Sequence, residues 1–255
     1  MKMIERRVLA RLSLHNMLPN LTAESEKSVA MYISPSSFPT RINALLDEAS
    51  ITSADKVIKA ANNEIVIKEA AKYQTGAVIF WDRDGYIILP PFPINEDRVL
   101  SGKFGTSLLA ELLEQEHTVG IVLVTWGSYS IGVFDNGNLI ASKVGTGHIH
   151  KEHKKGGSSQ KRFARRTEEQ KKSFLRRVSN RVKETLSKHS LDYIFFGGNR
   201  LIRRPLWQEC CYLESQADKV SSRILDIRYA NRATLNNSLS ETMKSVVFVF
   251  RVGND

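Results

Sequence analysis

Apolar and β-branched residues form three closely spaced runs in the middle of the chain, at residues 119–125, 129–134 and 139–144. The second and third runs are separated by residues 135–138 (Asp-Asn-Gly-Asn), which favour the left-handed backbone of a tight hairpin turn. The first two runs are separated by a short turn that contains a glycine. We therefore predict three consecutive strands that form an antiparallel meander.

The chain after the meander alternates between helical and extended patterns. Apolar residues recur every four positions between Phe174 and Leu186, which predicts an amphipathic helix over residues 163–188. Further patterns predict a strand, a helix and a strand, at residues 193–196, 205–220 and 223–227. The resulting order β-β-β-α-β-α-β suits a mixed sheet with helices packed on it, as in ribonuclease H-like domains. The predicted fold class is α/β (α+β).

The beginning and the end of the chain carry weaker patterns. We expect an amphipathic segment, a strand, a helical stretch, a hairpin and a helix, at residues 3–18, 29–33, 42–71, 78–89 and 107–116. The apolar run at residues 246–250 predicts an extra strand. We place a domain boundary between a small N-terminal unit, residues 1–75, and a second domain, residues 76–255, with a long basic loop at residues 145–162.

Positive charge is concentrated in one segment of the chain. The net charge is +10, and residues 143–183 hold 14 Lys and Arg against 3 Glu, so this segment carries the whole excess. Such a concentration indicates a polyanionic partner, either nucleic acid or an anionic membrane surface. No apolar run is long enough to span a bilayer, and no secretory signal is recognisable. The two cysteines are adjacent and fit a reducing compartment, so we expect a cytoplasmic protein without a membrane partner.

The basic loop ends in a short motif that can carry chemistry. Its only large apolar residue is Ile149, and a loop this long with so little to bury is either disordered or functional. Residues 156–160 read Gly-Gly-Ser-Ser-Gln. Glycines allow a close approach of the backbone to a ligand, and a glutamine amide can donate and accept hydrogen bonds at once.

This motif, followed by Lys-Arg-Phe-Ala-Arg-Arg at residues 161–166, resembles the catalytic loop of the release-factor-like peptidyl-tRNA hydrolases of ribosome quality control. These are relatives of the catalytic domain of archaeal and eukaryotic class I release factors. True release factors carry a contiguous Gly-Gly-Gln, whereas the quality-control branch carries Gly-x-x-Gln, which residues 157–160 match. The resemblance covers residues 119–228 in the order of elements, and it extends to the strand end at residues 32–35. It implies that residues 76–255 are a ribonuclease H-like catalytic domain.

The resemblance also implies an activity and roles for individual residues. The reaction would be hydrolysis of the ester between a nascent peptide and its tRNA, at the peptidyl-transferase centre of the large ribosomal subunit. Gln160 would orient the attacking water, since an amide does not titrate near neutrality. The expected catalytic residues are Gly156, Gly157, Ser158, Ser159 and Gln160. The expected RNA-binding residues are Lys154, Lys155, Lys161, Arg162, Arg165, Arg166, Lys172, Arg176 and Arg177.

The expected partners are ribosomal RNA and peptidyl-tRNA, with neither a cofactor nor a metal. His148, His150 and His153 have a spacing that invites a metal, but the surrounding positive charge opposes a cation. Phe163 is expected to seat the long helix on its domain, with stacking on a base as the alternative. Because no stop-codon-reading domain is recognisable, release of peptides from stalled subunits is favoured over termination.

Two other functions stay open at this stage. One is an endonuclease that cuts the tRNA acceptor end, in which Glu152 and His153 could form an acid–base pair. A two-metal nuclease would need clustered carboxylates on the sheet, and Asp135 and Asp192 do not make a convincing set. The other is a non-catalytic factor that binds RNA or the ribosome.

Overall fold

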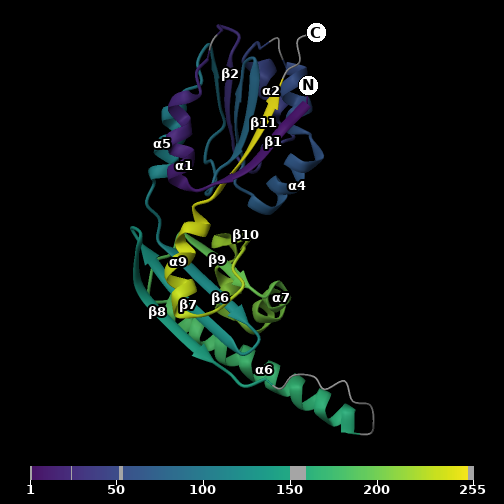
Figure 1. Ribbon diagram of the computed structural model, residues 1–255, viewed down its shortest axis with the longest axis vertical. Coiled ribbons are helices and arrows are strands. Elements are labelled where there is room, and N and C mark those ends of the chain that lie inside the picture. Colours follow the sequence, from purple (N-terminus) through teal and green to yellow (C-terminus); the bar gives the residue numbers. More distant parts are fainter. Residues whose placement is uncertain (1, 24, 52–53, 150–158, 252–255) are drawn as a thin grey trace. The chain divides into compact units, whose positions relative to one another are not determined.

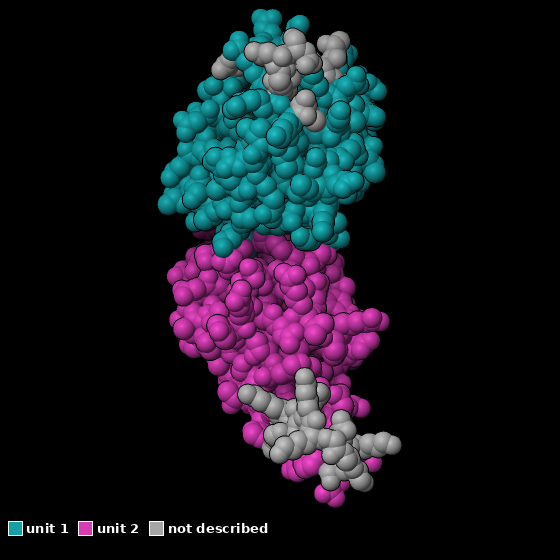
Figure 2. Space-filling view, turned by 45° about the vertical axis from the view of Figure 1, so that its right-hand side comes forward, with its two compact units in different colours: residues 1–115, 242–255 teal, residues 116–241 magenta. Residues whose placement is uncertain are grey.

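The computed structural model describes residues 2–23, 25–51, 54–149 and 159–251, with the side chains of residues 54 and 159–161 excepted. The chain divides into two compact units, shown in different colours in Figure 2. Unit 1 consists of residues 1–115 and 242–255, and unit 2 of residues 116–241. The boundary that we placed at residue 75 therefore lies inside unit 1, because the strands on either side of it share one sheet.

Unit 1 is built on a sheet in which every neighbouring pair of strands is antiparallel. In spatial order the strands are β1 (Lys2–Leu9), β11 (Ser245–Arg251), β4 (Asp84–Leu89), β3 (Ala77–Trp81), β2 (Val29–Ile33) and β5 (Arg98–Ser101). The predicted strand at the end of the chain thus exists as β11. It lies inside the sheet of unit 1, between the first strand and the hairpin β3–β4.

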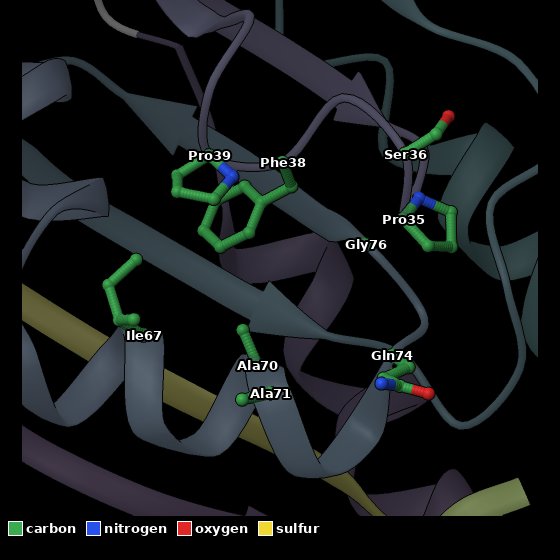
Figure 3. A pocket seen from close by; sticks show the side chains of 9 residues that line it. All are labelled: Pro35, Ser36, Phe38, Pro39, Ile67, Ala70, Ala71, Gln74 and Gly76. Atoms are coloured by element: carbon green, nitrogen blue, oxygen red, sulfur yellow. The ribbon is translucent and has the colours of Figure 1, made fainter.

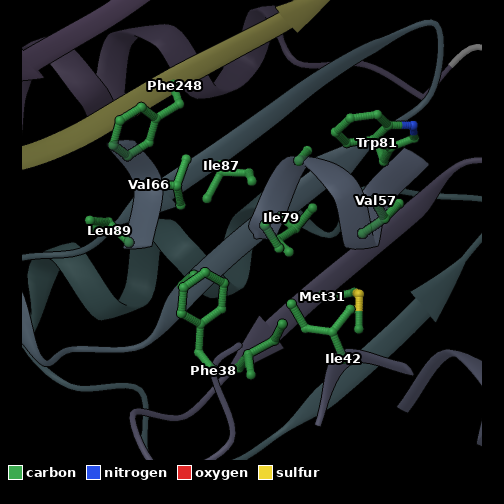
Figure 4. Close-up of a cluster of buried hydrophobic side chains, with 14 of the residues drawn as sticks. Met31, Phe38, Ile42, Val57, Val66, Ile79, Trp81, Ile87, Leu89 and Phe248 are labelled. Atoms are coloured by element: carbon green, nitrogen blue, oxygen red, sulfur yellow. The ribbon is translucent and has the colours of Figure 1, made fainter. Parts of the chain in front are cut away.

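Helices cover both faces of this sheet (Figure 1). One face carries α2 (Ile42–Glu48), α3 (Ala54–Ala61) and α4 (Glu64–Tyr73), and the other carries α1 (Arg11–Met17) and α5 (Thr106–Glu114). Side chains alternate between the two faces, so Met31 joins the first core and its neighbour Tyr32 the second. Figure 4 shows Met31 and Phe248 in the first core, where each is fully buried. Such burial stabilises the fold by about 1.5–3 kcal/mol for each side chain.

Two elements of unit 1 differ from the sequence prediction. The expected amphipathic segment at residues 3–18 is a strand followed by a short helix, because its first residues pair with β11 from the far end of the chain. The predicted helical stretch at residues 42–71 is divided among α2, α3 and α4. Strand β5 was not predicted, since its four residues carry no alternating pattern.

Unit 2 contains a mixed sheet. Its strands lie in the order β10 (Val220–Leu225), β9 (Tyr193–Gly198), β6 (Val119–Thr125), β7 (Ser128–Asp135) and β8 (Asn138–Thr146). The pairs β6–β7 and β7–β8 are antiparallel, which confirms the predicted meander. Strands β9 and β10 join it in parallel. The predicted α/β (α+β) class and the ribonuclease H-like order of strands are confirmed.

Helices pack on both faces of this second sheet as well. Helix α6 (Ser159–Leu186) packs on β7 and β8 and on helix α7 (Arg200–Glu209). On the other face, Leu235 of α9 (Arg232–Thr242) lies over Gly132 of β7, where a Cβ atom would be 3.0 Å from Cδ1 of the leucine.

The predicted helix at residues 205–220 is wrong in its bounds. It begins earlier, because the side chain of Asn199 accepts a hydrogen bond from the N–H of Leu201 and caps α7 at residue 200. It also ends earlier, since Cys210 separates α7 from the short helix α8 (Cys211–Ser215). Cys210 is buried, whereas Cys211 is exposed.

Candidate functional site

Helix α6 changes character along its length. From Phe174 onward, a stripe of buried side chains packs on the sheet. Among the described side chains of residues 162–173, in contrast, Thr167 alone is buried. Figure 1 shows the beginning of α6 running past the edge of the sheet of unit 2. The first half of the helix, before Phe174, therefore lies largely outside the core that stabilises the remainder.

This projecting part of α6 is strongly basic. Arg165 forms an ion pair with Glu169 at 3.1 Å, and Lys171 forms one with Glu168 at 2.7 Å. Exposed pairs of this kind contribute roughly 0–1 kcal/mol, so their cations remain available to a stronger anion. Within the described part of the chain, five more cations of α6 form no ion pair, namely Arg162, Arg166, Lys172, Arg177 and Lys183.

The chain segment that leads from β8 toward α6 is fixed where it leaves the sheet. The N–H of Gly147 donates a hydrogen bond of 2.8 Å to the carbonyl oxygen of Gly127, in the turn between β6 and β7. A Cβ atom at Gly147 would lie 2.7 Å from Cδ2 of Phe174, and one at Gly145 would lie 2.4 Å from the ring of Tyr129. Only glycine allows this close contact, so residue 147 sits directly against the first buried turn of α6.

Trp126 connects the same turn to the basic helix. Its ring centroid lies 6.3 Å from that of Phe174, and Nζ of Lys171 lies 5.6 Å from it, within the range of a cation–π contact. Neither Trp126 nor Lys171 is among the site residues predicted from the sequence. The sequence signal that could have found them is the Trp-Gly pair in the turn after the first strand of the meander. Two glycines at the end of the third strand, at residues 145 and 147, lie at the same end of the sheet.

The structure describes some of the predicted site residues and not others. Helix α6 begins at Ser159, so Gln160 lies in its first turn and the helix starts four residues earlier than predicted. Residues 154–158, which include both glycines of the motif, lie outside the described residues, as do His150 and His153. Exposed side chains on α6 belong to Arg162, Arg165, Arg166, Lys172, Arg176 and Arg177. Phe163 is 51% exposed, so the expectation that it seats the helix on the domain is wrong.

The carboxylates considered for a nuclease have structural roles. Asp135 accepts a hydrogen bond of 2.7 Å from the hydroxyl of Thr118, and Asp192 accepts one of 2.8 Å from the N–H of the same residue. Both therefore hold the start of β6. The residues that the structure describes contain no group of three or more His, Cys, Asp or Glu side chains that could hold a metal ion.

Beside Asp192, the ring of His117 packs edge-on against Tyr193 at 5.1 Å. Burial lowers the pKa of this histidine, and the charge of Asp192 opposes the shift. The imidazole therefore favours its neutral form.

Unit 1 has a concave feature of its own, shown in Figure 3. This pocket of about 490 Å³ lies between α4 and the loop that follows β2. The described residues that line it are Pro35, Ser36, Phe38, Pro39, Ile67, Ala70, Ala71, Gln74 and Gly76. None of these side chains titrates near neutrality, so this lining offers no acid or base.

No helix in the described ranges combines the length and apolar character that a membrane span requires.

Comparisons with known proteins point to translation factors. The chain is 30% identical over 168 residues to the eukaryotic peptide chain release factor subunit 1 of Oxytricha trifallax, covering 62% of this chain and 37% of that protein. It is 25% identical over 267 residues to the peptide chain release factor subunit 1 of Aeropyrum pernix, covering 95% of this chain and 70% of that protein. The crystal structure of the archaeal translation termination factor aRF1 matches over 92% of this chain and 70% of its own, with 18% identity and a TM-score of 0.40.

The chain thus spans only 37% of the length of the Oxytricha relative and 52% of the Saccharomyces cerevisiae one. The family of actinobacterial and chloroflexi VLRF1 release factors matches residues 117–247, which is just over half of the chain and includes all of the sheet of unit 2. The protein belongs to this VLRF1 release factor family.

Proposed function

We propose that the protein binds the large ribosomal subunit and hydrolyses the ester bond of peptidyl-tRNA, with residues 156–160 presented at the beginning of α6. The observation that carries this proposal is the projecting first half of α6. It is basic, it has almost no apolar packing of its own, and it directly follows the glycines of the motif. A helix of this kind suits a narrow crevice walled by RNA, where phosphates supply the missing counter-charges.

The start of α6 at Ser159 gives the motif an electrostatic role. The first N–H groups of a helix have no intrahelical acceptor, and the helix dipole adds partial positive charge at this end. Tetrahedral intermediates of ester hydrolysis carry an oxyanion, which such N–H groups stabilise. Gln160 lies in this first turn, where its amide would orient the attacking water. The proposed roles of the protein are therefore orientation and charge stabilisation, which require no titrating side chain.

The basic residues of α6 would set the approach to the RNA. Arg162, Arg166 and Lys172 form no ion pairs with described residues, so contacts with phosphates would not have to displace a carboxylate first. Each phosphate contact releases condensed counterions, which makes the affinity depend strongly on salt.

The test is peptide release from peptidyl-tRNA on purified large subunits, comparing the wild type with Gln160→Ala. Removal of one group that stabilises the transition state of acyl transfer lowers the rate by about 10²–10³-fold. We expect a loss of this order in the single-turnover rate, with unchanged affinity for the subunits. Gln170→Ala is the matched control, because it removes the same amide from the same helix about three turns further on.

The state of the tRNA after the reaction separates the three candidate functions. An intact 3′ end with a free ribose hydroxyl supports ester hydrolysis. A shortened acceptor end indicates an endonuclease. Binding without cleavage of either bond indicates a non-catalytic factor, and full activity of Gln160→Ala contradicts the proposed chemistry.

A further inference from the structure

A second basic feature lies at the beginning of α7. It is at the same end of the sheet of unit 2 as Gly147, where the chain leaves β8 toward α6. The N–H of Asn199 donates a hydrogen bond of 2.8 Å to the carbonyl oxygen of Val124, near the end of β6. The turn with Trp126 follows directly, and its Gly127 accepts the hydrogen bond from Gly147. A short chain of backbone contacts therefore links the start of α7 to the point where the basic segment leaves the sheet.

Three arginines occupy the first turns of α7, and they fall into two kinds. Arg203 is committed to the fold, since its guanidinium donates hydrogen bonds of 2.9 and 3.0 Å to the carbonyl oxygens of Ser222 and Ser221. Burial lowers its pKa. Arg200 and Arg204 are exposed, and neither forms an ion pair or a hydrogen bond through its side chain with the residues that the structure describes.

Arg200 and Arg204 lie at a spacing of four residues, so their side chains emerge from the same face of the helix. Leu201 beside them is 80% exposed, which shows that the described part of the fold leaves this side of the first turn open. Two positive side chains can therefore reach one linear anion together.

Their position works against the stability of the helix. The N-terminus of a helix carries partial positive charge, and a cation there costs roughly 0.3–1 kcal/mol. The first turn of α7 has no acidic residue to compensate. An anion bound between the two guanidinium groups would remove this repulsion and add charge-assisted hydrogen bonds.

We propose that Arg200 and Arg204 form a second phosphate-binding site, which contacts an RNA backbone beside the RNA bound by α6. This site rests on the proposed function for its natural partner, which is ribosomal RNA, and it adds a contact surface that the motif and the long helix do not include. RNA is favoured over an acidic protein because the start of α7 and the segment that leads into α6 leave the same end of the sheet, as the hydrogen bonds of Asn199 and Gly147 show. Two anchoring points at that end would fix the direction from which α6 enters its crevice.

The experiment compares Arg200→Ala/Arg204→Ala with the wild type in two binding assays, one with a fluorescent RNA hairpin and one with purified large subunits. Affinities are measured from about 50 to 200 mM salt, the range in which phosphate contacts change affinity strongly. We expect an affinity at least tenfold lower for both RNA species. We also expect a salt dependence that is weaker by about two phosphate contacts. Since the helix dipole repels Arg200 in the first turn and Arg204 is exposed, the melting temperature should be unchanged or higher.

Lys183→Ala/Lys188→Ala is the matched control for net charge. It removes two exposed cations from the opposite end of the same sheet, where Leu186 at the end of α6 packs against Gly120 of β6. Equal losses in both double variants would show that only net charge matters and would overturn the site. Wild-type affinity and salt dependence in the arginine variant, or no hairpin binding by the wild type, would overturn it as well. If the wild type binds the hairpin through these arginines but does not bind large subunits, the proposed function fails while the phosphate site stands.

Discussion

The two units of the chain have the same kind of packing but differ in net charge. Each has a sheet with helices on both faces and a set of fully buried side chains. Unit 2 holds 22 Lys and Arg against 12 Asp and Glu, whereas unit 1 holds 15 of each. Since the neutral unit also forms a sheet that helices cover on both faces, such packing does not require the positive charge of unit 2, and self-repulsion opposes it. The comparison assigns the charge to a partner.

The same contrast is visible in the helices. Helices α2 to α4 of unit 1 pack on their sheet through buried side chains, whereas α6 of unit 2 continues past its sheet in Figure 1. An isolated helical stretch in water is only marginally stable. The projecting part of α6 therefore depends on the buried turns that follow it, which begin at Phe174.

The largest expected effect comes from one glycine in each unit. Gly76 has a φ of 78°, and a Cβ atom there would lie 2.0 Å from the carbonyl oxygen of Ile33. In unit 2, Gly198 has a φ of 95° and its Cβ would lie 2.2 Å from the carbonyl oxygen of Val124. We expect Gly76→Ala and Gly198→Ala each to destabilise its own unit by at least about 3 kcal/mol. The alanine must adopt a strained positive φ, and the neighbouring backbone must also move away from its Cβ atom. Hydrogen exchange of peptides from each unit measures this.

Gly137→Ala is the control for conformation alone. Its φ is 81°, but a Cβ atom there would meet nothing within 4 Å, so only the roughly 1–2 kcal/mol of a left-handed residue remains. Loss of protection throughout both units in either glycine variant would show that they unfold together, and would break the comparison.

A smaller effect is expected from the cations of α6. Arg162→Ala/Arg166→Ala/Lys172→Ala should weaken binding to large subunits and lower the salt slope by about one unit per lost phosphate contact. The unfolding free energy should change by less than about 0.5 kcal/mol, since these side chains are exposed. Binding at graded salt together with thermal unfolding measures both quantities.

The matching variant in the neutral unit is Lys56→Ala/Lys59→Ala/Lys68→Ala, which removes three exposed cations from α3 and α4. It should bind large subunits like the wild type. If both triple variants lose the same affinity, the difference between the units has no functional meaning.

The smallest effect is expected in the stability of unit 1 at low pH. Asp97 accepts hydrogen bonds of 2.7 Å from the N–H of Ser34 and 2.5 Å from the hydroxyl of Ser37. Burial raises the pKa of this carboxyl, but these hydrogen bonds and the charge of Arg41 outweigh burial and lower it. Its stabilisation is therefore complete above the unfolded-state pKa of about 3.9 and is lost as pH falls through the lower folded-state value. Asp97→Asn should cost unit 1 about 1 kcal/mol at pH 7, and the difference should vanish in strong acid.

Unit 2 should respond to acid in another pH window. The pKa of His117 is lowered in the fold, so its stabilising effect is present above the ordinary histidine value of about 6.5 and is lost as pH falls below it. As the pH falls from 7 to 5, hydrogen exchange should therefore show a loss of protection in unit 2 before unit 1. The reverse order would contradict both assignments.

The sequence predicted the fold of unit 2 better than that of unit 1. The meander of unit 2 is made of neighbours in the chain, and its hairpin turn at residues 135–138 is a local signal. In unit 1, the one strand among the described residues that pairs with β1 is β11, which lies more than two hundred residues later in the chain. The charged residues of β1 fit an amphipathic helix as well as a strand when that partner is unknown. Strand β11 is buried on both faces, so its run of apolar residues has no period that assigns it to a sheet.

The candidate site divides in the same way. Its motif and its basic residues could be found from sequence alone, because they are contiguous. The hydrogen bond between Gly147 and Gly127 and the contact of Lys171 with Trp126 could not be found in this way. Both depend on how a turn, a strand end and a helix meet. Arg200 and Arg204 were missed because Pro205 suggested that the helix begins after them.

The insertion of β11 between β1 and β4 has a consequence for the order in which the protein matures. During synthesis, every strand of unit 2 emerges before residues 245–251, so its sheet can close while the sheet of unit 1 still lacks an inner member. Until then β1 has no neighbour, and β4 presents an open, largely apolar edge. The neutral, N-terminal half of the molecule is thus completed last, and a chain cut short before its final strand would keep a folded basic unit beside an unfinished, aggregation-prone one.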